Sequence, residues 1–385
     1  MTIPGTGSNQ SCCLALFLAC LLCQLGLQVA SGFSMMEPPI PVLQSHRRLL
    51  PERLLIGYAT GCDEKVVKAV REGVNVVIWA FLDIRTQPDG KVATMGSLDL
   101  ECIRQTIARL DNEGYDDTVH LVSFGGWNGG HFDPHLTAED WYQAWKDLYG
   151  DIFHGLDWDQ EGHDDLDSPT NFFTLDCLEK MGRIARLARE DGYIVGMAPA
   201  QSYLDIQSPN FSRYVNLTEP ERPWHNEFHY FGANVYSYVL AKYGHYIDFI
   251  SVQFYESYSR AAMSVYHYGM SPDAYLQFYV NDLLQNSQSY FVDFEQDKAV
   301  GLASQRVSFP MSKLVFGFAN GWGADPHNEK NVFFEPKYIQ AAWSNMKVKP
   351  RGCMFWVIGE EGRDGVEYAK GLNSVLNIRK TCDSS

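Results

Sequence analysis

The sequence predicts an α/β fold in which parallel strands alternate with helices. Short, apolar, β-branched runs recur after residue 53, and longer amphipathic stretches separate them. The runs are apolar on both faces except at their C-terminal ends, where polar residues gather, as in buried parallel strands. Eight such units over about 330 residues favour a single (β/α)8 TIM barrel with elaborated β/α loops. The alternative, an open doubly wound sheet, is disfavoured because no Gly-x-Gly-x-x-Gly follows the first strand.

Each run is bounded by turn residues or by an amphipathic stretch. The expected strands are Leu54–Tyr58, Val74–Leu82, Thr118–Phe124, Ile152–Asp159, Tyr193–Ala198, Phe249–Tyr255, Lys313–Phe318 and Gly352–Val357. The clearest helical patterns are Leu98–Leu110, Phe172–Asp191 and Pro336–Met346. Segments 201–245 and 281–312 exceed simple connections, so we expect extra loops or helices there.

The N-terminus is typical of a secretory signal peptide. Residues 12–27 are an apolar run, and the small residues Ala30, Ser31 and Gly32 follow it. We therefore divide the chain into a signal peptide (1–31), a proline-containing leader (32–52), the barrel (53–378) and a short tail (379–385). No Lys or Arg precedes the run, so an uncleaved anchor is the alternative. We expect a secreted protein that does not contact membranes after cleavage.

The net charge narrows the choice of partners. The chain carries 31 basic and 47 acidic residues, a formal net charge of −16. This acidity argues against nucleic acid and anionic membranes. Aromatic residues make up 14% of the chain, which suits stacking on sugar rings, although protein cores use them too. We expect a monomer with a neutral substrate.

The cysteines and glycosylation sequons agree with secretion. Removing the signal peptide leaves five scattered cysteines without metal-ligand spacing, so we expect one or two disulfides and a spare thiol. Two sequons begin at Asn210 and Asn216, which predicts a glycoprotein.

Three carboxylates mark the end of the fourth expected strand. Asp157, Asp159 and Glu161 occupy alternate positions, so all three project from one face of the strand. Three acids so close cannot all ionise, and at least one should hold a proton near neutral pH. A protonated acid beside ionised ones is what general acid catalysis requires.

Other strands also end in polar or aromatic residues. Because catalysis in such barrels occurs at the C-terminal ends of the strands, these residues form the candidate site. They are Ser123, Gly125 and Gly126 after the third strand, Met197 on the fifth, Gln253 and Tyr255 on the sixth, and Trp356 on the eighth.

These motifs, in this order, resemble glycoside hydrolases of family 18, the chitinases, and most closely the plant class III type. The strand-four signature Asp-Gly-x-Asp-x-Asp-x-Glu is matched by His-Gly-Leu-Asp-Trp-Asp-Gln-Glu at 154–161. The Ser-x-Gly-Gly motif is matched at 123–126 and Gln-Phe-Tyr-Asn at 253–256, with Glu in place of Asn. The tryptophan of strand eight is Trp356, and the resemblance covers about residues 53–378.

The resemblance implies substrate-assisted cleavage of β-1,4 bonds in chitin or N-acetylglucosamine oligosaccharides, with retention of configuration. It implies that Glu161 is the general acid and base, that Asp159 binds the acetamido N–H, and that Asp157 tunes Asp159. Tyr255 would hold the acetamido oxygen. The resemblance implies that Gln253, Trp356 and Gly126 bind substrate. From its strand-end position we expect Met197 to do so too, with Tyr58, Phe81, Trp127 and Tyr258 as further aromatic contacts. No metal, nucleotide or organic cofactor is implied.

Two positions depart from the family pattern. His154 replaces the first acid of the signature and alternates away from the other acids, so we expect it to affect packing or acid tuning. Glu256 replaces an asparagine and adds charge near the site. Two alternative functions stay open: a chitin-binding lectin on an inactive barrel, and an endo-β-N-acetylglucosaminidase acting on N-glycans. Lectin-type members typically lose the signature glutamate, whereas Glu161 is present here.

Overall fold

The computed structural model describes residues 48–163, 165, 167–215, 233–256, 259–284, 287–324 and 332–379. The expected signal peptide, most of the leader and most of the C-terminal tail lie outside these ranges. Tyr258, Cys382 and the sequon at Asn216 also lie outside the described residues.

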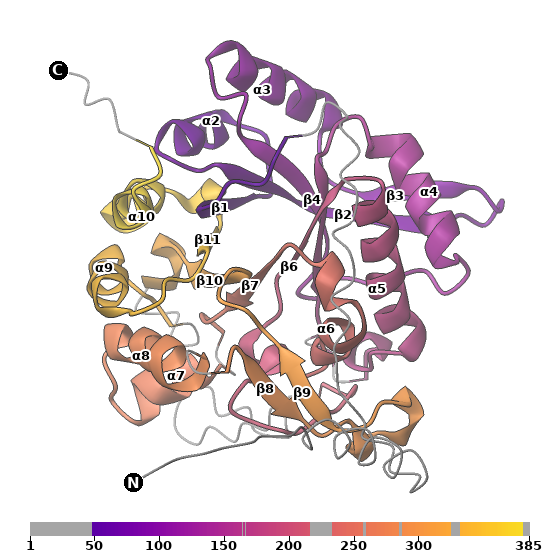
Figure 1. The fold of residues 1–385 in the computed structure, drawn as a ribbon. Coiled ribbons are helices and arrows are strands. Elements are labelled where there is room, and N and C mark those ends of the chain that lie inside the picture. The colour runs from indigo at the N-terminus through magenta and orange to yellow at the C-terminus, as the bar shows by residue number, and fades with distance from the viewer. Residues whose placement is uncertain are drawn as a thin grey trace, which may run out of the picture. The chain divides into compact units, whose positions relative to one another are not determined.

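The described chain forms a closed barrel of parallel strands (Figure 1). The strands are β1 (Leu54–Ala59), β2 (Val76–Thr86), β4 (Val119–Gly126), β5 (Gly155–Gln160), β6 (Ile194–Met197), β7 (Phe249–Gln253), β10 (Leu314–Ala319) and β11 (Gly352–Trp356). Each pairs with the next in parallel, and β1 pairs with both β11 and β2, which closes the barrel. The predicted (β/α)8 barrel is confirmed, and every expected strand run overlaps an observed barrel strand.

Alternation along the strands separates two cores. Leu54, Ile56 and Tyr58 of β1 point into the barrel and belong to a small interior cluster. Leu55 lies in a much larger cluster between the strands and the surrounding helices. Both faces are apolar because both are buried, which is the pattern that marked these runs in the sequence.

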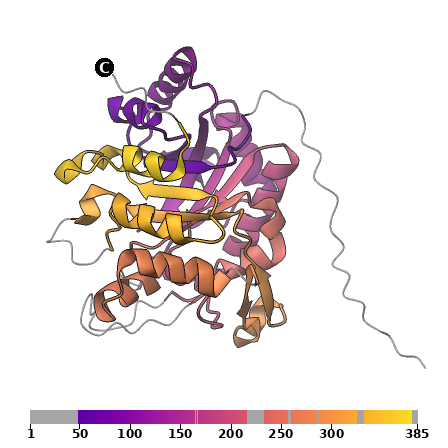
Figure 2. The ribbon, with the colours of Figure 1, turned by 60° about the vertical axis from the view of Figure 1, so that its left-hand side comes forward.

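Helices lie along the outer side of the barrel strands, as Figure 2 shows for the C-terminal part of the chain. They are α2 (Glu64–Arg71), α3 (Leu100–Asn112), α4 (Ala138–Tyr149), α5 (Leu175–Glu190), α6 (Ser237–Tyr243), α7 (Arg260–Ala262), α8 (Pro272–Phe278), α9 (Pro336–Asn345) and α10 (Tyr368–Leu376). Asp63, Asp99, Thr137 and Thr174 cap the N-termini of α2 to α5 by accepting backbone N–H groups. Within the described ranges, no helix is long and apolar enough to cross a bilayer.

Two additions lie outside the basic β/α repeat. Strand β3 (Val92–Gly96) folds back antiparallel on the end of β2, an extension that no sequence signal had indicated. Strands β8 (Ser289–Val292) and β9 (Gln305–Ser308) form an antiparallel pair inside the long 281–312 segment. The other long segment contains a short 3₁₀ helix at Gln201–Leu204 and α6.

One disulfide links the loop after β1 to helix α3. Cys62 and Cys102 are bonded across a sequence separation of 40, with their Cα atoms 6.1 Å apart. Cys177 and Cys353 are buried free thiols. The pairing could not be read from the sequence, because the spacing of scattered cysteines does not specify which of them meet.

We expect this disulfide to contribute about 2–4 kcal/mol to the free energy of unfolding, because it closes a loop of this length in the unfolded chain. Replacing both Cys62 and Cys102 by Ser should lower the urea midpoint, and a reductant should lower the midpoint of the wild type towards that of the double variant. The double variant is its own control, since its midpoint should not respond to reductant. Equal midpoints in all four measurements would contradict the expected contribution.

Candidate active site

Three carboxylates lie together at the C-terminal end of β5. Asp157 and Asp159 belong to the strand and Glu161 follows it directly. Asp157 lies opposite Ser123 of β4, and Asp159 lies opposite Gly125. Their exposed fractions are 0% for Asp157, 4% for Asp159 and 6% for Glu161. Acids this buried must be hydrogen-bonded or neutral, because an unpaired buried charge is costly.

Asp157 is the deepest of the three acids. Its Oδ2 accepts hydrogen bonds from the Tyr58 hydroxyl at 2.6 Å and the Ser123 hydroxyl at 2.7 Å. Burial raises the pKa of Asp157 to about 6, and the two hydrogen bonds oppose that rise. Tyr58 therefore contacts Asp157 directly, in addition to the aromatic contact with substrate that we expected for it.

Asp159 lies between the other two acids. The amide of Gln253 donates to Asp159 Oδ1 at 2.8 Å and to the carbonyl of Ala198 at 2.7 Å. Asp159 and Glu161 are hydrogen-bonded to each other. Burial, followed by the charges of Glu161 and Asp157, holds the pKa of Asp159 well above its usual range. Asp159 and Glu161 therefore titrate as a pair, and the first proton bound by the pair is held above the usual pH range of a carboxyl group.

Glu161 has a fourth acid as a neighbour. Burial raises the pKa of Glu161 to about 7, while hydrogen bonds with Asp159, Gln253 and Glu256 oppose the rise. Glu256 retains partial solvent exposure beside it. Removal from water and the charge of Glu161 raise the pKa of Glu256 well above its usual value. The sequence placed Glu256 only near the site, whereas the structure puts it in hydrogen-bonding contact with Glu161.

The backbone around Glu161 is held by three buried or half-buried rings. The Tyr236 hydroxyl donates to the carbonyl of Gln160 at 2.9 Å, and the N–H of Gly162 donates to the Tyr203 hydroxyl at 2.9 Å. His131 Nε2 donates to the carbonyl of Glu161 itself at 2.9 Å. Sequence reasoning missed all three residues, because they lie in the connections between barrel strands and no motif marks them.

An aromatic group forms the apolar side of the site. Trp356 stacks on Phe81 with ring centroids 5.6 Å apart and an interplanar angle of 22°, and it lies 5.5 Å from the Tyr58 ring. Gly126 lies against Phe81, where a Cβ atom would come within 2.5 Å of the ring. The structure thus brings together Tyr58, Phe81, Gly126 and Trp356, as expected from the sequence.

Tyr255 lies two residues after the end of β7 and retains partial exposure. Its ring meets Trp322 edge-on at 6.1 Å, and Trp322 Nε1 donates to the carbonyl of Trp356 at 2.7 Å. Asn320 donates to the carbonyl of Val357 at 2.8 Å, which fixes the chain after Trp356. Asn320 and Trp322 were missed, although they directly follow strand β10 and the strand-end rule would have found them.

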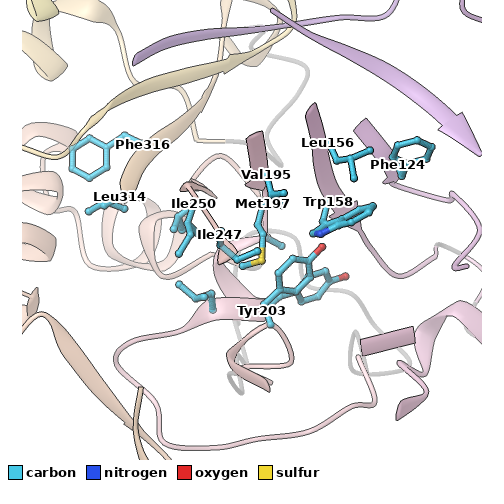
Figure 3. Close-up of a cluster of buried hydrophobic side chains, with 14 of the residues drawn as sticks. Phe124, Leu156, Trp158, Val195, Met197, Tyr203, Ile247, Ile250, Leu314 and Phe316 are labelled. Atoms are coloured by element: carbon cyan, nitrogen blue, oxygen red, sulfur yellow. The ribbon is translucent and has the colours of Figure 1, made fainter. Parts of the chain in front are cut away.

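Met197 does not lie in this site, so its expected place among the substrate-binding residues needs correction. It is fully buried in the cluster between strands and helices, with Trp158, Tyr203 and Ile247 (Figure 3). The reason is register: Met197 is paired with Trp158, whose side chain points away from the barrel interior. Alternation along β5 places Trp158 on the outer face, and the register with β6 then places Met197 there too.

His154 lies at the opposite end of β5 from Glu161. Its Nδ1 accepts the backbone N–H of His120 at 2.9 Å, and the two imidazole rings are 5.9 Å apart. Its contacts are therefore with the start of β4. Trp127, in contrast, follows β4 on the side of the acids and is 40% exposed.

The arrangement can supply a proton and then take one back. Burial brings the pKa of Glu161 to about 7, and Glu161 is hydrogen-bonded to Asp159, whose pKa is raised as well. In the part of the chain that the structure describes, no group of three or more His, Cys, Asp or Glu side chains is arranged to hold a metal ion.

Comparison with known proteins supports the fold. The structure is similar to the C-terminal domain of Legionella pneumophila ChiA, with a TM-score of 0.51, 13% identity, and coverage of 84% of this chain and 98% of that one. It also resembles a GH18 chitinase from Pseudoalteromonas aurantia (TM-score 0.45, 17% identity, coverage 83% and 99%). A third similar structure is the xylanase and α-amylase inhibitor protein XAIP-II from Scadoxus multiflorus (TM-score 0.45, 13% identity, coverage 86% and 100%). No family model and no curated protein matches the sequence. At 13% identity, the likeness to the Legionella domain shows the barrel fold alone.

Proposed function

We propose that this protein is a secreted glycoside hydrolase of the family 18 chitinase type, close to the plant class III branch. It would cleave β-1,4-linked N-acetylglucosamine polymers with retention of configuration. The observation that carries the proposal is the buried cluster of Asp157, Asp159 and Glu161 at the end of β5, in which Asp159 is hydrogen-bonded to Glu161 and to Gln253. The Trp356 ring lies against Tyr58, which donates to Asp157.

In the proposed reaction the substrate supplies its own nucleophile. Glu161 donates its proton to the glycosidic oxygen as the bond to the anomeric carbon breaks. The acetamido oxygen, positioned by Tyr255, forms a bond to that carbon and gives an oxazolinium ion, whose positive charge a carboxylate at Asp159 stabilises. Glu161, now ionised, removes a proton from the incoming water. The water attacks the anomeric carbon from the face that the leaving group vacated, which breaks the bond to the acetamido oxygen and retains the configuration. Asp157 takes up the proton that Asp159 gives away.

The decisive experiment measures hydrolysis of N-acetylglucosamine hexamers by the wild type and by Glu161→Gln. We expect β-anomeric products from the wild type and a loss of kcat of about 10²–10⁴ in the variant, because the general acid is removed. Glu295→Gln, which changes an exposed glutamate outside the site, is the matched control and should retain full activity.

The alternative functions predict other results in the same assay. Binding to chitin without any product from the wild type would overturn hydrolysis in favour of the lectin. Cleavage restricted to N-glycans would keep the reaction and overturn the chitin substrate. An active Glu161→Gln variant would remove Glu161 from the mechanism.

The buried acids should also lower stability at high pH. Glu161 has an ordinary pKa of 4.5 when unfolded and about 7 when folded, so the folded state binds more protons between these values. Stability therefore falls as pH rises through this window, by on the order of 3 kcal/mol for this group. Glu161→Gln should be more stable than wild type at pH 8, and the difference should shrink towards pH 4. Thermal unfolding across pH measures this, and a difference independent of pH would contradict it.

Glu256 should influence the pH range of activity. Because the hydrogen bond from Glu256 lowers the pKa of Glu161, Glu256→Leu should move the alkaline limb of kcat/KM to higher pH. Glu256→Gln keeps a hydrogen-bond donor at this position and serves as the comparison variant, with a smaller shift. An unchanged alkaline limb in Glu256→Leu, at retained activity, would show that Glu256 does not influence the ionisation of Glu161.

A further inference from the structure

A cavity of about 710 Å³ opens at the end of the barrel opposite to the acids. Arg53, Asp248, Lys313 and Arg351, which line it, directly precede β1, β7, β10 and β11. The cavity thus lies under the N-terminal ends of four strands, the face of such barrels that is remote from catalysis. Nothing in the proposed hydrolysis uses it.

Positive charge dominates the walls of this cavity. Four cationic side chains line it, namely Arg53, Lys313, Lys349 and Arg351, together with His245. The acidic side chains in the lining are Glu52 and Asp248. Such an excess of cations is unexpected in a chain whose formal net charge is −16, because acidic side chains outnumber basic ones by 47 to 31.

The four cations are hydrogen-bonded to neutral groups. Lys313 donates to the carbonyl of Gly244 at 2.6 Å, and Arg53 donates to that of Pro350 at 2.6 Å. Arg351 donates to the carbonyl of Asp248 at 3.0 Å. The remaining contacts are also to carbonyls: Arg351 to Pro51 at 3.1 Å, and Lys349 to Met346 at 2.8 Å and to Trp343. These bonds orient the cations without cancelling their charge.

The two acids of the lining, Glu52 and Asp248, offset only part of the charge of the four cations. The Asp248 carboxylate accepts the backbone N–H of Val195 at 2.9 Å and lies 3.2 Å from Arg189 Nε, so it is already engaged by another cation. In the described ranges, no ion pair joins any of the four lining cations to a carboxylate. Burial lowers the pKa of Lys313, and the charges of Arg189 and Arg351 add to that effect, while Asp248 opposes it. The walls therefore carry excess positive charge at neutral pH.

We propose that this cavity binds a tetrahedral oxyanion, a phosphate or sulfate group, held by Arg53, Lys313, Lys349 and Arg351. Guanidinium and ammonium groups together supply the directed donors and the charge that such a dianion needs. The volume is many times that of one water molecule, about 30 Å³. A phosphate ester therefore fits as well as the free ion, and the two sources share the same binding chemistry.

Titration calorimetry and thermal unfolding of the purified protein test the proposal. The probes are inorganic phosphate, sulfate and glycerol phosphate, and chloride at equal ionic strength is the reference. We expect phosphate to bind with Kd below about 1 mM and to raise Tm in proportion to ln(1 + [L]/Kd). Lys313→Gln combined with Lys349→Gln should weaken binding at least tenfold. Lys347→Gln, an exposed lysine outside the lining, is the matched control and should bind like the wild type.

Each outcome decides the proposal. Stronger binding of glycerol phosphate than of phosphate would identify an ester as the ligand, and the reverse would identify the free ion. If phosphate raises Tm no more than chloride does, or if the double variant binds as tightly as wild type, the site does not exist. Should the double variant unfold, Lys349→Gln alone provides the same comparison. Hydrolysis of N-acetylglucosamine oligomers is measured separately, so either proposal can fail alone.

Discussion

The structure of the candidate site depends on the cost of burying carboxylates. Asp157, Asp159 and Glu161 are almost completely shielded from water, so each must share a proton or accept hydrogen bonds. Tyr58 and Ser123 donate hydrogen bonds to Asp157, and Gln253 donates one to Asp159. Asp159 and Glu161 are hydrogen-bonded to each other. The same shielding raises their pKa values, which turns a destabilising cluster into a source of protons near neutrality.

The barrel stabilises this cluster of acids because its strands hold the hydrogen-bonding partners of the acids in fixed positions. Its strands bring Tyr58, Ser123 and Gln253 from three different parts of the chain to within hydrogen-bonding distance of one β5 face. Three residues from the connections between strands, Tyr203, Tyr236 and His131, then fix the peptide groups around Glu161. At the opposite end, the cations that precede β1, β10 and β11, together with Lys349, line a cavity that holds only two acids. The ionisable groups of the two ends thus differ in sign.

Sequence reasoning succeeded where local pattern and placement coincide. Runs apolar on both faces identified the barrel strands, and strand ends identified Gln253, Tyr255 and Trp356 as neighbours of the acids. It was wrong for Met197, because strand-end position was used without register. Residues such as Tyr203, Tyr236 and Trp322 had no local signal or were passed over, since their roles arise from contacts between distant segments.

The sequence by itself determined the alternation of buried strands and helices and the presence of three acids on one strand face, since both follow from periodicity along a single segment. Only the tertiary structure decided which groups touch those acids, that Glu256 shares a hydrogen bond with Glu161, and that Cys62 meets Cys102. The tertiary structure alone showed that Arg53, Lys313, Lys349 and Arg351 line one cavity. Such contacts join residues far apart in the chain, and their distances depend on how all the intervening elements pack.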